Sequence, residues 1–353
     1  MNWQRVSRIG SLLLIAALFA VVLAYTDVEK VGRAFTGIKW GWAVCVPLLN
    51  FANTLVEALR LAVVLFPIKR HFRFRNTLNS TLLAIVGNVL LPLRFGDGAR
   101  AWYLSKTEKM GLSSSLSALM LDRVADFFFF FVLMALTATL YQLPPSLEKA
   151  AVLAAALFVG AIALTVAVAG IGHRIGSRSE GRIRSKIALE VKHFMAGLSV
   201  MSNAGLMFPI GFCSVVSWLL RGGMIWVMFR AFSLDLPFIA TPITLIILNF
   251  GIAVVSTPAN LGGFELATVG ALRLFGVEIE VALSYALALH VIEVAPMVGA
   301  GVAVLWFEGF KTGDMMKTVK DLPLKDVEAV PESWPQSAED VKDSEQEEPG
   351  RFQ

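Results

Sequence analysis

The chain has 353 residues, of which 56% are hydrophobic and only 16% are charged, and its mean hydropathy is +0.68. This composition excludes an ordinary soluble domain, in which about 25% of residues are charged. It indicates an integral membrane protein with helical spans of about 20 apolar residues each. The net charge is +4, but residues 311–353 carry 11 acidic and 6 basic side chains, so the first 310 residues hold +9. On so apolar a body, this charge does not indicate a nucleic-acid partner.

Apolar stretches recur along the chain at the length of membrane helices. They lie near residues 9–25, 41–66, 78–93, 115–141, 150–172, 206–232, 239–256 and 282–308, with a shorter one at 264–276. The first stretch follows Arg5 and Arg8 and is also compatible with a cleaved secretory signal peptide. We favour a span, because no soluble domain that could be exported follows it.

Basic loops predict the orientation of these spans. Loops 69–75 and 174–186 are rich in Lys and Arg, so the positive-inside rule places both in the cytoplasm together with the N-terminus. The connections on the outside are then 27–40, 142–149, 233–238 and 277–281. These assignments are consistent with one another only if segments 78–100 and 239–276 each enter and leave the membrane on one side, as re-entrant hairpins.

Both of these segments are interrupted by helix-breaking residues. Pro92 and Gly96 interrupt the first, and Pro258 and Gly262 interrupt the second at the same four-residue spacing. Proline removes a backbone donor and glycine frees the backbone, so each helix is expected to unwind there. Such backbone is tolerated at membrane depth only inside protein or beside a wet cavity. The alternative is that these are loops between full spans.

The order of elements predicts an internal repeat. The halves, about 1–145 and 146–310, each read span, span, hairpin, span, with hairpins that open on opposite sides. The expected fold is therefore an all-α polytopic membrane protein, with about six full transmembrane helices and two re-entrant broken hairpins in an inverted repeat. In such folds the substrate site lies near the bilayer midplane where the broken elements meet. Residues 311–353, rich in charged residues, Ser and Pro, are expected to form a disordered acidic cytoplasmic tail.

Ionisable side chains occur inside several predicted spans, where they are costly and therefore suggest function. They are Glu57 and Arg60 in the second span, Asp122, Arg123 and Asp126 in the fourth, Arg221 in the sixth, and His290 and Glu293 in the last. Three-residue spacings allow pairing along one helix, as between Arg123 and Asp126. The alternative role for each such pair is a self-neutralising ion pair that helps helices pack. For Arg221, Glu265 and Glu293 are the expected partners.

The first broken segment also carries a candidate anion site. Arg94 and Arg100 flank the Gly96-Asp97-Gly98 turn, whose backbone N–H groups would be exposed. Backbone donors with two guanidinium groups suit a phosphate or carboxylate. The alternative is that these arginines act only as cytoplasmic topology signals. Cys45 and Cys213 both lie in apolar runs, so neither a disulfide framework nor a thiolate metal site is expected.

Taken together, these residues resemble the membrane region of lysylphosphatidylglycerol synthases and the stand-alone flippase-like proteins related to it. The resemblance covers about residues 9–310 and rests on Pro-Leu-Arg-Phe-Gly-Asp-Gly-Ala-Arg at 92–100, Asp-Arg-x-x-Asp at 122–126, and Pro-x-x-Leu-Gly-Gly-Phe-Glu at 258–265 followed by Ala-Leu-x-x-x-Gly-Val at 271–277. Two residues depart from the family pattern. Asp122 stands where Glu is usual, which preserves charge, and His290 stands where Arg is usual, which puts a fixed positive charge there in doubt.

The resemblance implies a multi-pass plasma-membrane protein, with cytoplasmic termini, that moves a phospholipid or lipid-linked head group between leaflets. The expected substrate-binding residues are Arg94, Gly96, Asp97, Gly98, Arg100, Asp122, Arg123, Asp126, Pro258, Gly262, Gly263, Glu265, His290 and Glu293. Arg94, Arg100 and Arg123 would bind an anionic head group, while Asp126, Glu265 and Glu293 would balance charge or carry a coupling proton. No metal or cofactor is expected, and the partner is a membrane lipid.

Two other functions stay open at this point. The chain could be a membrane-embedded transferase acting on a lipid-linked sugar or aminoacyl donor, although its body lacks an Asp-x-Asp pair and a nucleophile beside a base. It could also be a non-catalytic scaffold of a lipid-processing complex, with the acidic tail as its docking segment. A homo-oligomer or a lipid-biosynthesis enzyme partner is possible. The synthases' soluble domain is not expected, because only 43 residues follow residue 310.

Overall fold

The computed structural model describes residues 29, 35–67, 69, 71–90, 96–141, 156, 160, 204–254 and 257–308. Within these residues the chain is helical and contains no strand. The predicted span at 9–25, nearly all of the one at 150–172, the basic loop at 174–186 and the acidic tail at 311–353 lie outside the described residues.

Each predicted apolar stretch in the described part of the chain forms a helix. In chain order the elements are α3 (Trp40–Ala43), α4 (Cys45–Leu65), α5 (Phe74–Leu90), α6 (Gly96–Glu108), α7 (Leu112–Leu140), α10 (Ala204–Ala231), α11 (Ala240–Val254), the 3-10 turn η2 (Pro258–Asn260), α12 (Gly263–Arg273) and α13 (Ile279–Phe307). Helices suit these runs because lipid offers the backbone no hydrogen-bond partner.

Three described helices are long and apolar enough to cross a membrane. They are Trp40–Leu65, which joins α3 to α4, Gly205–Ala231 within α10, and Ile279–Phe307, which is α13. Helix α7 has 29 residues, the same length as α13, but it carries Asp122, Arg123 and Asp126. Helix α11 is apolar but has only 15 residues. The chain is therefore a helical membrane protein, while the number of full spans stays a prediction.

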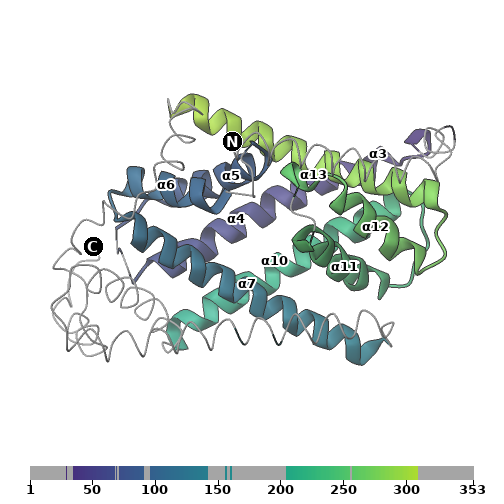
Figure 1. Ribbon diagram of the computed structural model, residues 1–353, viewed down its shortest axis with the longest axis horizontal. Coiled ribbons are helices and arrows are strands. Elements are labelled where there is room, and N and C mark those ends of the chain that lie inside the picture. Colours follow the sequence, from purple (N-terminus) through teal and green to yellow (C-terminus); the bar gives the residue numbers. More distant parts are fainter. Residues whose placement is uncertain are drawn as a thin grey trace, which may run out of the picture.

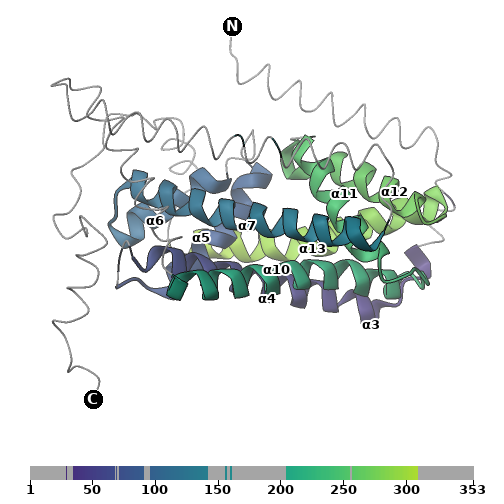
Figure 2. The same cartoon turned by 90° about the horizontal axis from the view of Figure 1, so that it is seen from below.

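The long helices run along the long axis of the molecule, and the two shorter pairs occupy different ends of it. In Figure 1, α5 and α6 lie toward one end, and α11 and α12 lie toward the other, with α4, α7 and α10 crossing between them. The view in Figure 2 gives the same separation of the two pairs. Helix α13 passes both pairs and packs against α5 and α12.

Ion pairs and loop contacts define which helix ends lie together. Lys69 Nζ lies 2.8 Å from Glu108 Oε2, and Arg75 Nη2 lies 2.7 Å from Glu308 Oε1. These pairs join the start of α5, the end of α6 and the end of α13. We call this region the basic end, and it includes residues 69–75.

The opposite ends of the helices gather in a second region, which we call the far end. The Lys39 N–H donates to the Ala231 carbonyl at 2.9 Å, and the Tyr141 ring centroid lies 6.4 Å from that of Phe275. The pair α5–α6 therefore opens at the basic end, and α11–α12 opens at the far end. This geometry is compatible with the two re-entrant hairpins and the inverted repeat, both of which stay predictions.

Small residues allow the arms of each hairpin to pack closely. A Cβ on Gly96 would collide with the Ala84 carbonyl and the Asn88 side chain, and the Gly96 N–H donates to Asn88 Oδ1 at 3.0 Å. In the second hairpin, a Cβ on Gly251 would collide with that of Ala267. Close helix contacts through small residues are typical of membrane proteins. Helix α5 also contacts η2, so the two hairpins meet in the middle of the molecule.

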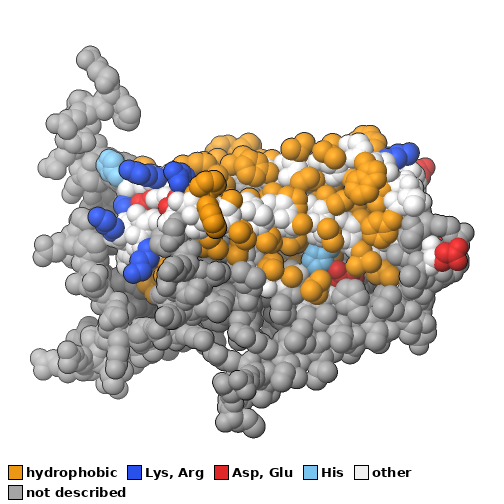
Figure 3. Space-filling model, turned by 90° about the horizontal axis from the view of Figure 1, so that it is seen from above, with side chains coloured by type: hydrophobic (Ala, Val, Ile, Leu, Met, Phe, Trp, Pro, Cys, Tyr) orange, Lys and Arg blue, Asp and Glu red, His pale blue; other side chains and the backbone are white. Residues whose placement is uncertain are grey.

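The surface follows the same division into two ends. Figure 3 shows a broad band of hydrophobic side chains over the middle of the described part, with Lys and Arg gathered beyond it at one end and a few acidic and basic side chains at the other. Exposed large apolar residues include Leu140, Phe208, Leu219, Trp306 and Phe307. An apolar belt of this extent on a helical protein fits contact with lipid.

Candidate functional site

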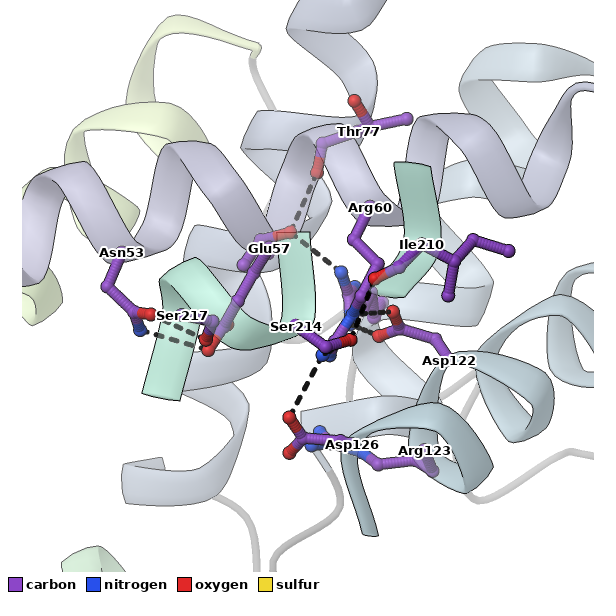
Figure 4. Close-up of polar contacts among 12 residues, drawn as sticks. Asn53, Glu57, Arg60, Thr77, Asp122, Arg123, Asp126, Ile210, Ser214 and Ser217 are labelled. Carbon is purple, nitrogen blue, oxygen red and sulfur yellow. Dashed lines mark hydrogen bonds and ion pairs between the residues drawn. The ribbon is translucent and has the colours of Figure 1, made fainter. Parts of the chain in front are cut away.

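Arg60 of α4 lies at the centre of a buried charge network. Its Nε lies 2.7 Å from Asp122 Oδ1, and its Nη1 lies 3.0 Å from Asp126 Oδ1, both on α7 (Figure 4). The same Nη1 donates to Ser214 Oγ of α10 at 3.2 Å. Only 1% of Arg60 is exposed. The alternative considered for Arg60, an ion pair with Glu57 along α4, does not form, because the guanidinium reaches the facing helix, where two carboxylates lie one turn apart.

Asp122 links Arg60 to a second buried arginine. Its other oxygen, Oδ2, lies 3.2 Å from Arg100 Nη1, and Arg100 Nη2 donates to Thr81 Oγ1 at 2.9 Å. Arg100 is 3% exposed and Asp122 is 1% exposed. In this structure the Arg100 guanidinium holds α5, α6 and α7 together, and its expected role in binding an anionic head group stays a prediction.

Arg123 points away from Arg60 and meets the start of α6. Its Nε lies 3.0 Å from Asp97 Oδ2 and its Nη2 lies 2.7 Å from Asp97 Oδ1, a two-pronged pair. The side chains are 40% and 44% exposed. The pairing of Arg123 with Asp126 that the spacing along α7 allows does not form, because Asp97 on the neighbouring hairpin offers both oxygens in the geometry that a guanidinium prefers.

Arg221 of α10 is the fourth arginine of this charge network, and it contacts carboxylates of α4 and α7. Its Nη2 lies 2.6 Å from Glu57 Oε1 and its Nη1 lies 3.5 Å from Asp126 Oδ2. The guanidinium also lies over the Trp218 ring, 4.8 Å from the centroid, as in a cation–π contact. The expected partners Glu265 and Glu293 are therefore wrong. Glu57 is closer because α4 and α10 are packed side by side along their length.

Neutral polar side chains complete this network. Asn53 Nδ2 donates to Glu57 Oε1 at 3.0 Å, and Ser217 Oγ donates to Asn53 Oδ1 at 2.7 Å. Sequence reasoning missed Asn53 and Ser217, as well as Thr81 and Ser214. Their signal was present, because each is a polar residue inside an otherwise apolar run.

We call this group the arginine network; it balances four positive against four negative charges. Its members are Arg60, Arg100, Arg123 and Arg221 with Glu57, Asp97, Asp122 and Asp126. Buried charges are tolerated when they are paired and hydrogen-bonded, and removing one partner leaves an uncompensated charge. The network therefore fixes the relative positions of α4, α6, α7 and α10.

A second polar centre lies at the tip of the other hairpin. Glu265 Oε1 of α12 lies 2.7 Å from His290 Nδ1 of α13, and the His290 Nε2 lies 2.9 Å from the Ala259 carbonyl oxygen. Glu265 Oε2 accepts a hydrogen bond from the Gly262 N–H at 2.7 Å. The Phe264 ring stacks on the imidazole at 4.3 Å. We call this pair the Glu265–His290 dyad.

Glu293 lies between the two centres. Asn50 Nδ2 donates to its backbone carbonyl at 2.9 Å, which fixes α13 against α4. Within the described residues its half-buried carboxylate makes no hydrogen bond or ion pair, while His290, Arg221 and Glu57 act on it electrostatically. The structure thus brings Glu293 near charged groups of α4, α10 and its own helix α13.

The remaining predicted site residues that the structure describes lie where α6, η2 and α12 begin, at the tips of the two hairpins. Gly96, Asp97 and Gly98 begin α6, so this stretch is helical rather than an open turn. Pro258 begins η2, Gly262 precedes α12 and Gly263 is its first residue. Arg94 and Pro92 lie outside the described residues. Among the described residues no group of three or more His, Cys, Asp or Glu side chains could hold a metal ion.

A further carboxylate, Glu108, is held at the basic end, outside the spans. Burial by itself raises the pKa of Glu108, but hydrogen bonds from Lys69, the Arg73 N–H and Asn76 outweigh burial and lower it below its ordinary value of 4.5. The Asn76 Nδ2 lies 2.6 Å from Glu108 Oε1. This cluster ties the end of α6 to the start of α5.

The fold and these polar centres define a class: a helical integral membrane protein with paired charges buried at the depth of its spans. The profile of the family described as "Lysylphosphatidylglycerol synthase TM region" matches residues 8–301. The chain therefore belongs to this family, as the sequence motifs predicted, and the family links it to lipid metabolism. Neither the curated proteins nor the solved structures that were searched contain a match to it.

Proposed function

We propose that this protein moves a phospholipid or a lipid-linked head group between membrane leaflets. One observation carries the proposal: two helical hairpins open at opposite ends of the molecule and meet in its middle, beside a cluster of paired charges. Charged side chains at membrane depth are costly and mark substrate or ion pathways. Broken elements that meet at the midplane are also the usual place of transporter sites.

The contacts divide the arginines into supporting and accessible ones. Arg60 and Arg100 are almost fully buried, so they support the helix arrangement. Arg123 is 40% exposed, and its two-pronged partner Asp97 lies in the first turn of α6. A phosphate presents oxygen pairs with the same geometry as a carboxylate. An anionic head group could thus replace Asp97 at Arg123 beside the positive N-terminal end of α6.

The rest of the architecture follows from this proposal. The transport domain would span about residues 1–310, with repeat halves of about 1–145 and 146–310, in the plasma membrane. The basic end would face the cytoplasm, because Lys and Arg accumulate on that side. Hairpin α5–α6 would then open to the cytoplasm and α11–α12 to the outside, which gives each leaflet its own entry to the centre.

Leaflet exchange in liposomes tests the proposal directly. Purified protein is reconstituted with labelled anionic or neutral lipids, and the fraction of label reachable by an external quencher is followed over time. We expect exchange that is selective for one head-group class and is lost in Arg123→Ala. Arg230→Ala is a matched control, because Arg230 is 43% exposed but lies at the far end beside Asp235. Exchange at the wild-type rate in Arg123→Ala would remove Arg123 from the site.

Absence of exchange with every lipid would count against transport itself. The protein must then be shown to be folded, which thermal unfolding monitored by tryptophan fluorescence can establish. Under that result, a role for the chain in lipid metabolism other than transport would have to be sought.

A further inference from the structure

The hydrogen bonds of the Glu265–His290 dyad, at the tip of the second hairpin, determine how many protons the two side chains hold between them. The Ala259 carbonyl oxygen can only accept, so His290 Nε2 must carry the proton in the 2.9 Å contact between them. The 2.7 Å contact between His290 Nδ1 and Glu265 Oε1 then requires one further proton. That proton lies either on the imidazole, giving an imidazolium and a carboxylate, or on the acid, giving two neutral groups.

Loss of this second proton is incompatible with the observed geometry. The single imidazole proton that remains can then serve only one of the two contacts, so lone pairs face each other either between Nδ1 and Oε1 or between Nε2 and the Ala259 oxygen, and the dyad carries one uncompensated negative charge. Glu265 is 2% exposed and His290 is 5% exposed, and the Phe264 ring covers the imidazole. Water cannot screen a charge in such a place, so repulsion must be relieved by movement of the two groups apart.

The backbone at this tip depends on the dyad. Ala259 and Asn260 have φ values of +54° and +59°, and Gly262 has +82°. Left-handed conformations are unfavourable for residues with a Cβ, so two in succession need support from their surroundings. His290 supplies that support at the Ala259 carbonyl, and Glu265 supplies it at the Gly262 N–H. When the dyad separates, the Ala259 carbonyl loses the contact that holds it to α13.

Other charged groups near the dyad are few or engaged elsewhere. Glu293, three residues further along α13, acts electrostatically on His290 and is itself faced by Arg221 and Glu57. Helix α11 contains no charged residue. The other charged side chains on helices packed against α13 have partners away from the dyad: Arg75 with Glu308, Arg273 with the Val277 carbonyl, Arg230 with Asp235, and Arg60 with Asp122 and Asp126.

We propose that Glu265 and His290 together form a binding site for one proton, and that this proton latches the tip of the α11–α12 hairpin to α13. With the proton bound, the tip is closed; when the proton leaves, the tip is released. The ligand of this site is a proton, exchanged with water on the side to which the tip opens. The latch is a property of the fold, and it supplies proton coupling to transport only if the proposed function holds.

Accessibility of a buried tip residue tests the latch without any transport. Thr257 is 1% exposed, so Thr257→Cys in a Cys45→Ser, Cys213→Ala background reports opening through reaction with a maleimide. Each rate is divided by the rate of the same variant in dodecyl sulfate at the same pH, which removes the pH dependence of the thiol. We expect the corrected rate to rise about tenfold per pH unit through the transition, the slope for loss of one proton.

An isosteric variant separates the proton from the hydrogen bonds. In Glu265→Gln the new amide can donate to Nδ1 and accept from the Gly262 N–H, so all three hydrogen bonds form without a dissociable proton. We expect labelling in this variant to stay slow across about pH 5 to pH 9. Glu265→Ala should label fast throughout, and Glu280→Gln, a carboxylate substitution at the start of α13, should follow the wild type. A pH-independent wild type, or a Glu265→Gln that titrates like it, would overturn the proposal.

Nitrogen NMR of the histidines gives an independent measurement. The chain has four histidines, so protein labelled with 15N-histidine gives a short spectrum in which His290 is assigned by its loss in His290→Gln. We expect the His290 signals to titrate in the wild type and to stay constant in Glu265→Gln. Leaflet exchange on the same samples then separates the two proposals. A latch that titrates in protein without exchange would retain the proton site and refute transport.

Discussion

Two polar centres in the described part of the chain hold charge by different means. The arginine network joins α4, α6, α7 and α10 through four arginines and four carboxylates. The dyad joins α12, α13 and η2 through one acid and one imidazole. Arginine stays protonated at any physiological pH, whereas histidine and a paired acid exchange protons in that range. The buried pairs of the network are therefore a permanent scaffold, whereas the proposed latch makes the dyad a connection that depends on pH.

The largest effect is expected when Arg60, the central arginine of the network, is removed. Arg60→Ala leaves Asp122 and Asp126 buried and facing each other without their main partner. We expect a loss of about 3 to 5 kcal/mol in stability, the usual cost of breaking a buried ion pair. Thermal unfolding in detergent, followed by tryptophan fluorescence, measures it, with Arg230→Ala as the exposed control.

The losses of stability in Arg60→Ala and in His290→Ala should also differ in their pH dependence. Because Arg60 does not titrate, the destabilisation by Arg60→Ala should be the same at about pH 6 and pH 8. For His290→Ala it should shrink as pH rises, since the wild type itself loses the latching proton. Equal pH behaviour of the two variants would mean that the centres do not differ as proposed.

A smaller effect is expected at the close approach inside the first hairpin. Gly96→Ala places a methyl group against the Ala84 carbonyl and the Asn88 side chain, so the arms must separate. We expect a loss of about 1 to 3 kcal/mol, the usual cost of overpacking, read from the same unfolding curves. Gly270→Ala on α12 is the matched control, because nothing lies within 4 Å of its new Cβ. A stable Gly96→Ala protein would show that α5 and α6 can slide apart freely.

The smallest effect is expected at Glu108, whose pH response has the opposite sign to that of the dyad. Its pKa is lower in the folded protein than the ordinary value of 4.5, so its contribution is complete above that value and fades as pH falls toward the folded pKa. The difference in melting temperature between wild type and Glu108→Gln should therefore be present at neutral pH and diminish in acid. A difference that grows in acid would contradict the pairing with Lys69 and Asn76.

The sequence alone determined the class of the protein and the residues worth inspecting. Long apolar runs predicted the helices, because only a helix satisfies its own backbone within lipid. The helix breaks around Pro258 and Gly262 followed from residues that cannot sustain a regular helix. The motifs at 92–100, 122–126 and 258–277 also identified the family.

Only the tertiary structure decided which charges pair. Sequence spacing favours partners three or four residues apart on one helix, as for Glu57 with Arg60 or Arg123 with Asp126. The observed partners lie on other helices: Arg60 meets Asp122, Arg123 meets Asp97, and Arg221 meets Glu57. Long arginine side chains reach across the packed interface between helices. Because this interface excludes water, a well-oriented carboxylate on the facing helix stabilises the guanidinium more than an adjacent carboxylate on the same helix does. The contact of His290 with Ala259 likewise depends on how the hairpin tip folds back on α13, which no local pattern encodes.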